Sequence, residues 1–452
     1  MIRAYKKNSS GVYVLRKRVL YFDCLVILFQ LCCNLSLVHA FVFDIIPLSI
    51  GNVNLTLFML FAYLLRFGPR FRFISQIRIK NQLIFLWIIV LLWEALQGTL
   101  FFMEPYAMKG GIMLIDYIFF MEYLYELVKE KYTKDGLFYI SRVYCFYDAY
   151  SVLIIFISAI LLSVGFLDPE SNLIPVNSLT TGNVLEGGIN SYTFPGYLSV
   201  AVPEGRILDA FNIPLLSGLS HEPHVYHYSI LPAFFLLWYY LKMKGKKVFF
   251  YILLFLTIVS LFVATSATSL LVFPVIMVLH FIWQFYQRRQ ITRIVFFVLF
   301  CIFIYYLLFL TMGDTLSKME LLLEGKLTDT GGSKDYSAVV LNYFITPSSL
   351  FGHGIYGKLG LDVLKDDTGV GLISSVLVVG AYLVTVWKAI ICVFSSNQTK
   401  HFIGLSCLYF LMHTLKVGSL TFRYPLFIFI IFILSMSTFF ANQEIKNRSM
   451  DT

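Results

Sequence analysis

Runs of about 20 apolar residues recur along the whole chain, and each is long enough to cross a bilayer core of roughly 30 Å as one helix. Polar segments separate these runs. The pattern predicts an all-α integral membrane protein with about twelve transmembrane helices and two large periplasmic loops. We place the helices at residues 19–38, 47–66, 82–103, 110–128, 143–166, 226–242, 248–265, 267–286, 294–312, 369–391, 402–419 and 424–441.

The composition agrees with this class. Of the 452 residues, 58% are hydrophobic and 13% are charged, which is less charge than a soluble chain of this length needs to cover its surface. No internal repeat or linker marks a second domain, so residues 1–452 form a single polytopic membrane domain. The basic start of the chain lacks the small-residue cleavage site of a signal peptide.

Lysine and arginine set the orientation of the chain. Basic residues gather at the N-terminus and at 66–80, 129–134, 242–247 and 288–293. With twelve helices every cluster falls on one side, which the positive-inside rule makes cytoplasmic, and both termini lie there. The net charge of +9 is then a topology signal. We expect no nucleic-acid partner, because the chain has no basic soluble surface.

This topology leaves two long loops outside, 167–225 and 313–368, both rich in Gly, Pro, Asn, Asp and Ser. Long loops are usually functional, so we look for chemistry there. The chain has no Walker motif and no Gly-x-Ser-x-Gly elbow. It also has no Asp-x-Asp pair, which weakens the case for a metal-dependent sugar transferase. The seven cysteines lie in or beside apolar runs, which argues against disulfides and thiolate metal sites. We expect neither a metal nor a cofactor.

The densest set of candidate residues ends the first loop, in Gly218-Leu-Ser-His-Glu-Pro-His-Val-Tyr-His227. Its histidines and Glu222 can take a proton from a hydroxyl near neutral pH, which favours general acid/base chemistry. A zinc site is a weaker reading. The plain alternative is a helix start at the membrane surface, capped by Ser220 or Glu222. The candidate residues are His221, Glu222, His224 and His227.

The second loop ends in Ser349-Leu-Phe-Gly-His-Gly-Ile-Tyr-Gly357, followed by Asp366-Asp-Thr-Gly369 and by a helix that contains Gly380. The glycines permit tight turns and close approach of the backbone to a ligand. His353 lies between two of them, and Asp367 follows. The alternative is an ordinary re-entrant turn.

Three basic side chains lie where the positive-inside rule leads us to expect few, outside the membrane or within a membrane helix. Arg206 is the single base of the first loop, Arg423 begins the last helix, and Lys416 lies in the eleventh beside His413. Charge inside a membrane is costly, and an anionic ligand such as a pyrophosphate would explain these positions. Pairing with local acids is the alternative.

Three short elements resemble the O-antigen polymerase and ligase superfamily of bacterial surface-polysaccharide assembly. Gly218–Pro223 is similar to its Gly-x-x-x-Glu-Pro element, and Ser266–Leu271 is similar to its Ser/Thr element between two helices. Phe351-Gly-His-Gly, followed by Asp367-Thr-Gly and a glycine-containing helix, resembles the end of its second loop. Ligases of this superfamily usually carry a His-Asn pair before the tenth helix. This chain has Asp366-Asp-Thr-Gly369 there, which favours a polymerase.

The resemblance implies a metal-independent glycosyltransferase of the bacterial inner membrane. It would polymerise undecaprenyl-pyrophosphate-linked oligosaccharide repeats on the periplasmic face, for an O-antigen, a capsule or an exopolysaccharide. A ligase and a flippase for the same lipid-linked sugar are the alternatives, and a flippase would not need two long outer loops. Membrane lipid is an expected partner, and a chain-length regulator and a flippase are further candidates. The implied catalytic residues are Glu222, His221 and His353, and the implied substrate-binding residues are Arg206, Arg423, His224, Lys416 and Asp367.

Overall fold

The structure is a computed structural model of the whole chain. It describes residues 5–7, 13–15, 17–32, 51–69, 82–101, 105–129, 135–166, 174–176, 191–193, 200–202, 215–220, 223–264, 267–290, 292, 372–417 and 425–451.

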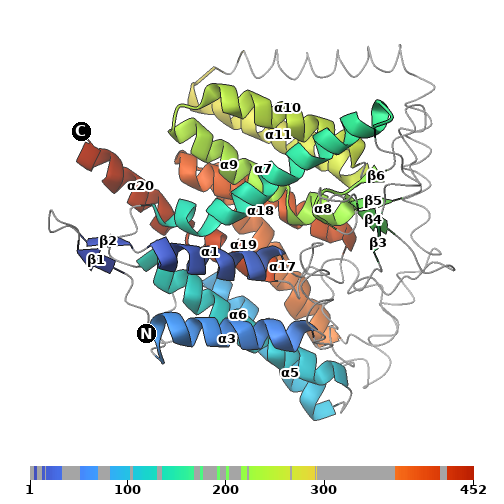
Figure 1. Ribbon diagram of the computed structural model, residues 1–452. Helices are drawn as coiled ribbons and strands as arrows, with labels where there is room; N and C mark the ends of the chain where they lie inside the picture. Colours follow the sequence, from blue (N-terminus) through green and yellow to red (C-terminus); the bar gives the residue numbers. More distant parts are fainter. Residues whose placement is uncertain are drawn as a thin grey trace.

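Helices dominate these residues (Figure 1). Each apolar run predicted to be a transmembrane helix coincides with one helix or with a pair, except 294–312, which lies outside the described residues. The helices are α1 (Lys17–Cys32), α3 (Gly51–Phe67), α5 (Gln82–Phe101), α6 (Pro105–Lys129), α7 (Gly136–Ser163), α8 (Pro223–Ser229), α9 (Pro232–Met243), α10 (Lys247–Val263), α11 (Ala267–Gln287), α17 (Leu372–Val393), α18 (Gln398–Val417), α19 (Pro425–Ser435) and α20 (Ser437–Asp451).

Three helices among the described residues are long and apolar enough to cross a membrane. They are Gly136–Ser163 in α7, Thr268–Gln287 in α11 and Val376–Val393 in α17. The pair α19 and α20 passes the same test together, but it bends by 56°. These helices agree with a membrane protein, while a total of twelve crossings stays a prediction.

The prediction of an all-α chain omits six short strands in two sheets. In the first sheet β1 (Tyr5–Lys7) pairs with β2 (Tyr13–Leu15). The second is antiparallel and has the order β3-β4-β5-β6. Its strands, which all come from the first long loop, are β3 (Ile174–Val176), β4 (Ser191–Thr193), β5 (Val200–Val202) and β6 (Leu215–Leu216). Strands of two or three residues are too short to show an alternating pattern, so the sequence gives no sign of them.

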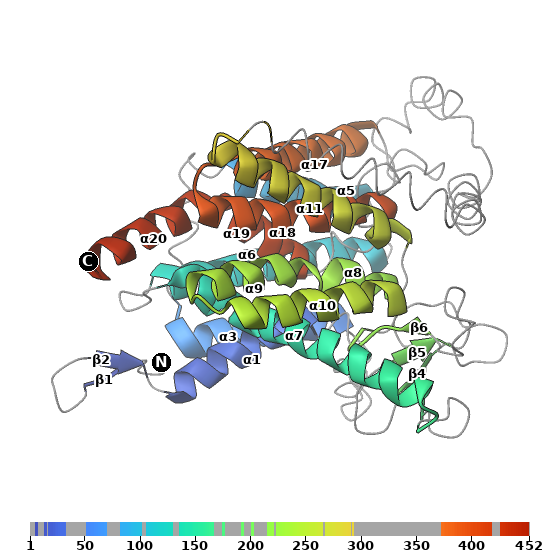
Figure 2. The ribbon, with the colours of Figure 1, turned by 90° about the horizontal axis from the view of Figure 1, so that it is seen from above.

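The two sheets lie at opposite ends of the helix bundle (Figure 2). The hairpin β1–β2 lies at the same end as the outer part of α20, near the C-terminus, and the second sheet lies at the other end (Figures 1 and 2). The first and last described elements therefore share one end of the bundle.

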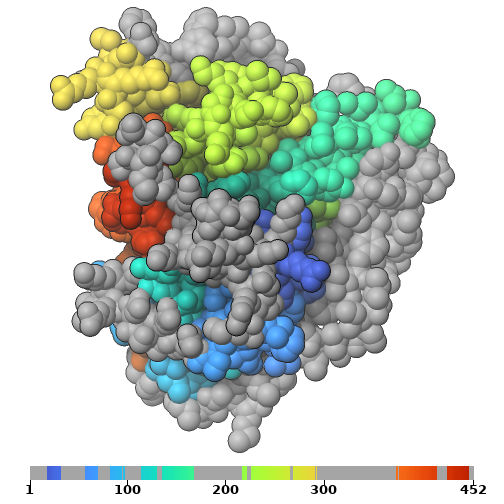
Figure 3. All heavy atoms as spheres, turned by 60° about the vertical axis from the view of Figure 1, so that its left-hand side comes forward, coloured from blue at the N-terminus to red at the C-terminus, as the bar shows by residue number. Residues whose placement is uncertain are grey.

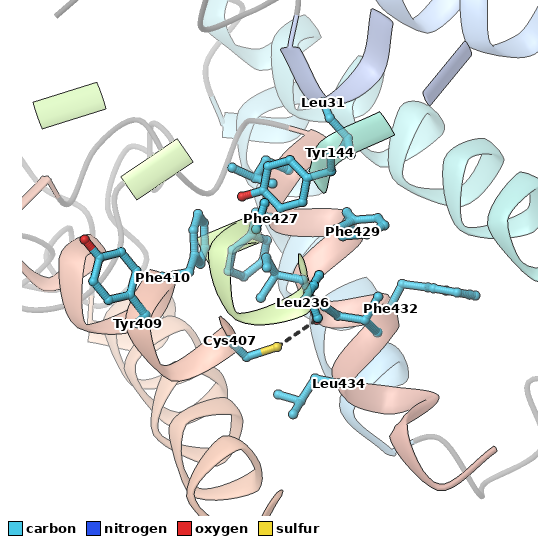
Figure 4. Packing of buried hydrophobic residues seen from close by; sticks show 14 of the residues in the cluster. Leu31, Tyr144, Leu236, Cys407, Tyr409, Phe410, Phe427, Phe429, Phe432 and Leu434 are labelled. Atoms are coloured by element: carbon cyan, nitrogen blue, oxygen red, sulfur yellow. Dashed lines mark hydrogen bonds between the residues drawn. The ribbon is translucent and has the colours of Figure 1, made fainter. Parts of the chain in front are cut away.

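Helix α19 occupies the centre of the bundle. Its residues from Pro425 to Leu434 are all buried, with neighbours in α1, α5, α6, α17 and α18. The ring of Trp87 on α5 meets that of Phe427 edge-on, with centroids 4.6 Å apart, and Tyr144 on α7 meets Phe429 at 5.8 Å. Figure 4 shows Tyr144, Phe427 and Phe429 within this packed cluster. A helix that is apolar on every side is buried on every side.

Apolar side chains also face outward. Along α10 they recur on one face, at Val248, Tyr251, Ile252, Phe255 and Phe262, and each is more than half exposed. Figure 3 shows α10 and α3 at the outer surface of the molecule. A soluble monomer rarely leaves so many large apolar groups in water, whereas lipid tails would cover them.

A polar cluster joins four helices near one end of the bundle. Arg66 of α3 donates to Asp23 of α1 through Nε (3.0 Å) and Nη2 (3.4 Å), and both side chains are buried. The hydroxyls of Tyr123 on α6 and Tyr139 on α7 also donate to Asp23, at 2.6 and 2.8 Å. The carboxylate thus receives four hydrogen bonds, which offset the cost of its burial.

Helices α17 and α18 approach each other most closely at Gly404. A Cβ atom there would lie 2.5 Å from the nitrogen of Val393 and 2.9 Å from the carbonyl oxygen of Ala389. Gly380 of α17, which the sequence suggested for close backbone approach, has nothing within 4 Å of its Cβ position. The close contact between these helices therefore belongs to Gly404, as is common where small residues bring membrane helices together.

We predict that Gly404→Ala lowers the melting temperature of the purified protein in detergent. The methyl group collides with backbone atoms, and such overpacking costs about 1–3 kcal/mol. The control, Gly380→Ala, should leave the melting temperature unchanged or raise it, because alanine favours a helix by about 1 kcal/mol over glycine. Equal behaviour of the two variants would contradict the packing of α17 on α18.

Candidate functional site

The sixth predicted helix, 226–242, is not continuous. It divides into α8 and α9, with a break at Ile230 and Leu231. The cause is Pro232, which has no backbone N–H and begins α9 as its first residue. Tyr144 of α7 donates to the carbonyl of Ser229 (2.6 Å), and Ser406 of α18 donates to that of Pro232 (2.8 Å). Tyr144 thus satisfies the Ser229 carbonyl that the break frees, and Ser406 ties the first turn of α9 to α18.

Helix α8 lies inside the bundle and not at its surface. From Val225 to Phe235 every residue is buried. The sequence allowed a helix start in the headgroup zone, but the described residues of α8 pack against α9 and α18. The end of the first loop therefore enters the protein interior.

Residues 217–220, which we call the strap, lead from β6 toward α8. The strap lies on α7, and Gly218 takes a φ of +60°. A Cβ atom at Gly218 would lie 3.2 Å from Cδ1 of Ile155 and 3.4 Å from Cβ of Ser151. Within the strap, Ser217 donates to the carbonyl of Ser220 at 2.6 Å. The glycine that opens the Gly-Leu-Ser-His-Glu-Pro element is thus required by both its conformation and its contact with α7.

Two side chains of α8 reach the end of α10. The hydroxyls of Tyr226 and Ser260 lie 2.8 Å apart. Nε2 of His227 lies 3.0 Å from the carbonyl oxygen of Ala264, so this nitrogen carries the proton and donates. His227 therefore anchors α8 to the segment that precedes the Ser/Thr element.

The Ser/Thr element meets α18 through a serine and a histidine. Ser269 Oγ lies 2.8 Å from Nε2 of His413, and Nδ1 of His413 lies 3.0 Å from the carbonyl oxygen of Tyr409. A carbonyl accepts only, so Nδ1 donates to Tyr409, and in the neutral ring Nε2 accepts from the serine. A neutral His413 would therefore present its basic nitrogen to a hydroxyl, which is the arrangement of a general base.

Tyr409 lies at the centre of this group. Its ring centroid is 4.4 Å from that of His413, 5.7 Å from that of Phe235 on α9 and 6.2 Å from that of Phe273 on α11. Helix α18 also packs against α8. Helix α8, the start of α11 and the last turns of α18 are therefore brought together, although they lie far apart in the sequence.

Most of the predicted site residues lie outside the described residues: His221, Glu222, Arg206, His353, Asp367 and Arg423. His224 falls on α8 and Lys416 on the last turn of α18, and only their backbones are described. The roles predicted for all eight stay predictions.

Sequence reasoning missed Asp148, which lies on α7 and is fully buried. It interacts electrostatically with Tyr226 and Tyr409, so it belongs to the same region. An acid inside an apolar run such as 143–166 is itself a signal of function, because charge within a membrane is costly. That signal was available from the sequence.

Within the described part of the chain, no group of three His, Cys, Asp or Glu side chains could hold a metal ion. Cys24, Cys145, Cys392 and Cys407 are free thiols. Comparisons with protein families, with curated proteins and with solved structures found no match for this chain.

We predict that Gly218→Ala destabilises the protein more than Gly245→Ala does. Both glycines have a left-handed φ, +60° and +66°, so alanine carries a similar backbone cost of about 1–2 kcal/mol at either. Only at Gly218 does the new methyl also press on Ile155 and Ser151, whereas nothing lies within 4 Å at Gly245. The melting temperatures in detergent give the comparison. If Gly245→Ala is as damaging, the strap is not packed on α7.

Proposed function

We propose that this chain is a metal-independent polymerase of lipid-linked oligosaccharides in a bacterial inner membrane. The growing chain on undecaprenyl pyrophosphate is the donor, and a hydroxyl of one lipid-linked repeat is the acceptor. The bond from the donor sugar to pyrophosphate breaks as the acceptor oxygen bonds to that sugar. A base takes the hydroxyl proton, and undecaprenyl pyrophosphate leaves.

One observation supports this proposal most directly. The strap and α8, which carry the first short element, lie in the same region as Ser269 of the second element and His413 of α18. Reactions of this kind need a base beside the acceptor hydroxyl and a clamp for the departing anion. His221 and Glu222 directly follow the strap, and Lys416 follows His413 by three residues, almost one helical turn.

In this proposal Glu222, His221 and His353 act on the acceptor hydroxyl. Arg206 and Arg423 hold the pyrophosphate, with His224, Lys416 and Asp367 beside the substrate. Apolar faces such as that of α10 suit a protein whose substrates carry a long lipid.

The catalytic prediction concerns Glu222→Gln, His221→Ala and His353→Ala. Each purified variant is incubated in liposomes with undecaprenyl-pyrophosphate-linked repeats extracted from the source cells, and products are resolved on a gel. The native protein should give a ladder of polymers. At least one variant should be slower by about 10²–10⁴-fold, the usual contribution of a general acid or base.

The matched control is Glu186→Gln, an acid of the same loop without an assigned role, which should keep the ladder intact. Normal polymerisation rates in all three variants would show that none of the three residues is catalytic. Movement of the lipid-linked repeat across the liposome without any ladder would show a flippase. Transfer to a lipid A core without a ladder would show a ligase.

The proposed topology gives a separate prediction. Reporter fusions at Asn183 and Gly331 should behave as periplasmic, because the Lys/Arg asymmetry puts both long loops outside. A fusion at Lys246, in the short turn between α9 and α10, should behave as cytoplasmic. Cytoplasmic behaviour at either loop position would overturn the proposed orientation.

A further inference from the structure

Asp148 has the environment of a ligand-binding residue. Its side chain is fully buried, and neither carboxylate oxygen has a hydrogen-bond partner among the described residues. No described basic side chain acts on it electrostatically. This differs from Asp23, whose carboxylate receives four hydrogen bonds. A carboxylate is costly to bury alone, so Asp148 is either neutral or balanced by a positive group that the described residues do not supply.

Two hydroxyl oxygens, one on α7 and one in the strap, also lack partners among the described residues. Ser151 follows Asp148 by three residues on α7 and therefore lies on the same helical face. The strap touches α7 at Ser151, and it ends in Ser220. The hydroxyls of Ser151 and Ser220 are buried, and neither has a hydrogen-bond partner within the described ranges. Helix α7 and the strap, which touch at Ser151, thus carry a carboxylate and two hydroxyls without described partners.

The broken helix lies beside the same place. Tyr144, one turn before Asp148 on α7, donates to the carbonyl of Ser229 at the end of α8. Tyr147 points its hydroxyl at the carbonyl of Leu219 in the strap, 3.5 Å away. In membrane transporters the ends of interrupted helices commonly lie at ion sites.

We propose that Asp148, Ser151 and the strap residue Ser220 form a binding site for a small monovalent cation, with Na⁺ as the ion to test. One carboxylate balances a single positive charge. Ca²⁺ takes six to eight oxygen ligands, often from several carboxylates, and Mg²⁺ keeps several waters. The oxygen atoms are hard ligands, and all are buried, so the ligand is a small ion and not a sugar.

The bound cation would tie the strap to α7. The strap continues directly into His221 and Glu222, so the ion would fix the start of the proposed catalytic element without contacting the substrate. This site does not depend on the proposed polymerase activity, since its residues and its ion can be measured without any lipid-linked sugar.

The test is the melting temperature of the purified protein in detergent, at one pH and one ionic strength, as Na⁺ replaces choline. A ligand that binds only the folded state raises stability with its concentration, so we expect a saturable rise of about 2–4 °C. The rise should vanish in Asp148→Asn and shrink in Ser151→Ala. Ser158→Ala is the control, because Ser158 is an equally buried serine of α7 whose hydroxyl also has no partner among the described residues.

Three results would overturn the site. One is the absence of any Na⁺ effect on the native protein. Another is an Na⁺-dependent rise in melting temperature that is as large in Asp148→Asn as in the native protein. If Asp148→Asn does not fold, the same rise in Ser151→Ala as in the native protein would overturn the site instead. The third is an Asp148→Asn protein that is more stable than the native one at every Na⁺ concentration, since the carboxyl would then be held in its protonated form.

Discussion

A helix in apolar surroundings must satisfy its own backbone groups, and the break between α8 and α9 is where this constraint shapes the molecule. Pro232 interrupts the ladder, and Tyr144 donates to the Ser229 carbonyl that is freed, while Ser406 donates to the carbonyl of Pro232 at the start of α9. These two side chains tie the break between α8 and α9 to α7 and α18. The first loop consequently ends inside the bundle, and its Gly-Leu-Ser-His-Glu-Pro element begins against buried helices and not at the surface.

Apolar packing alone does not determine which helices become neighbours in such a bundle. The side chains of α19 are apolar on every side, and α10 is apolar even where it faces outward. Hydrogen bonds between side chains determine which helices pair, because each bond requires one partner in one position. Trp87 of α5 donates to Thr385 of α17 at 2.9 Å, and Ser269 pairs α11 with His413 of α18. A few polar contacts therefore set the order of helices whose surfaces are otherwise interchangeable.

The sequence predicted the helices well, because runs of apolar residues are long and their edges are polar. It did not predict the break, although Pro232 is a visible signal, because the run continues through it. The strands of the first loop are too short to give a pattern. For the site, the sequence singled out Gly218 and Ser266–Leu271, but it could not show that Ser269 meets His413, which lies 144 residues away. Asp148 could have been singled out as an acid inside an apolar run, but only the structure shows that it is fully buried without a described partner.

Two of the buried carboxylates, Asp23 and Asp148, show how structure and function separate within one bundle. Around Asp23 every donor comes from the protein itself: an arginine and two tyrosines close the network, and three other helices are tied to α1. A closed network of this kind stabilises and has nothing left to offer a ligand. Around Asp148 the described residues supply further oxygen atoms and no described base, although it is just as buried. Helices of similar apolarity thus contain one carboxylate that completes the fold and another that has no partner among the described residues, which the proposed ion would supply.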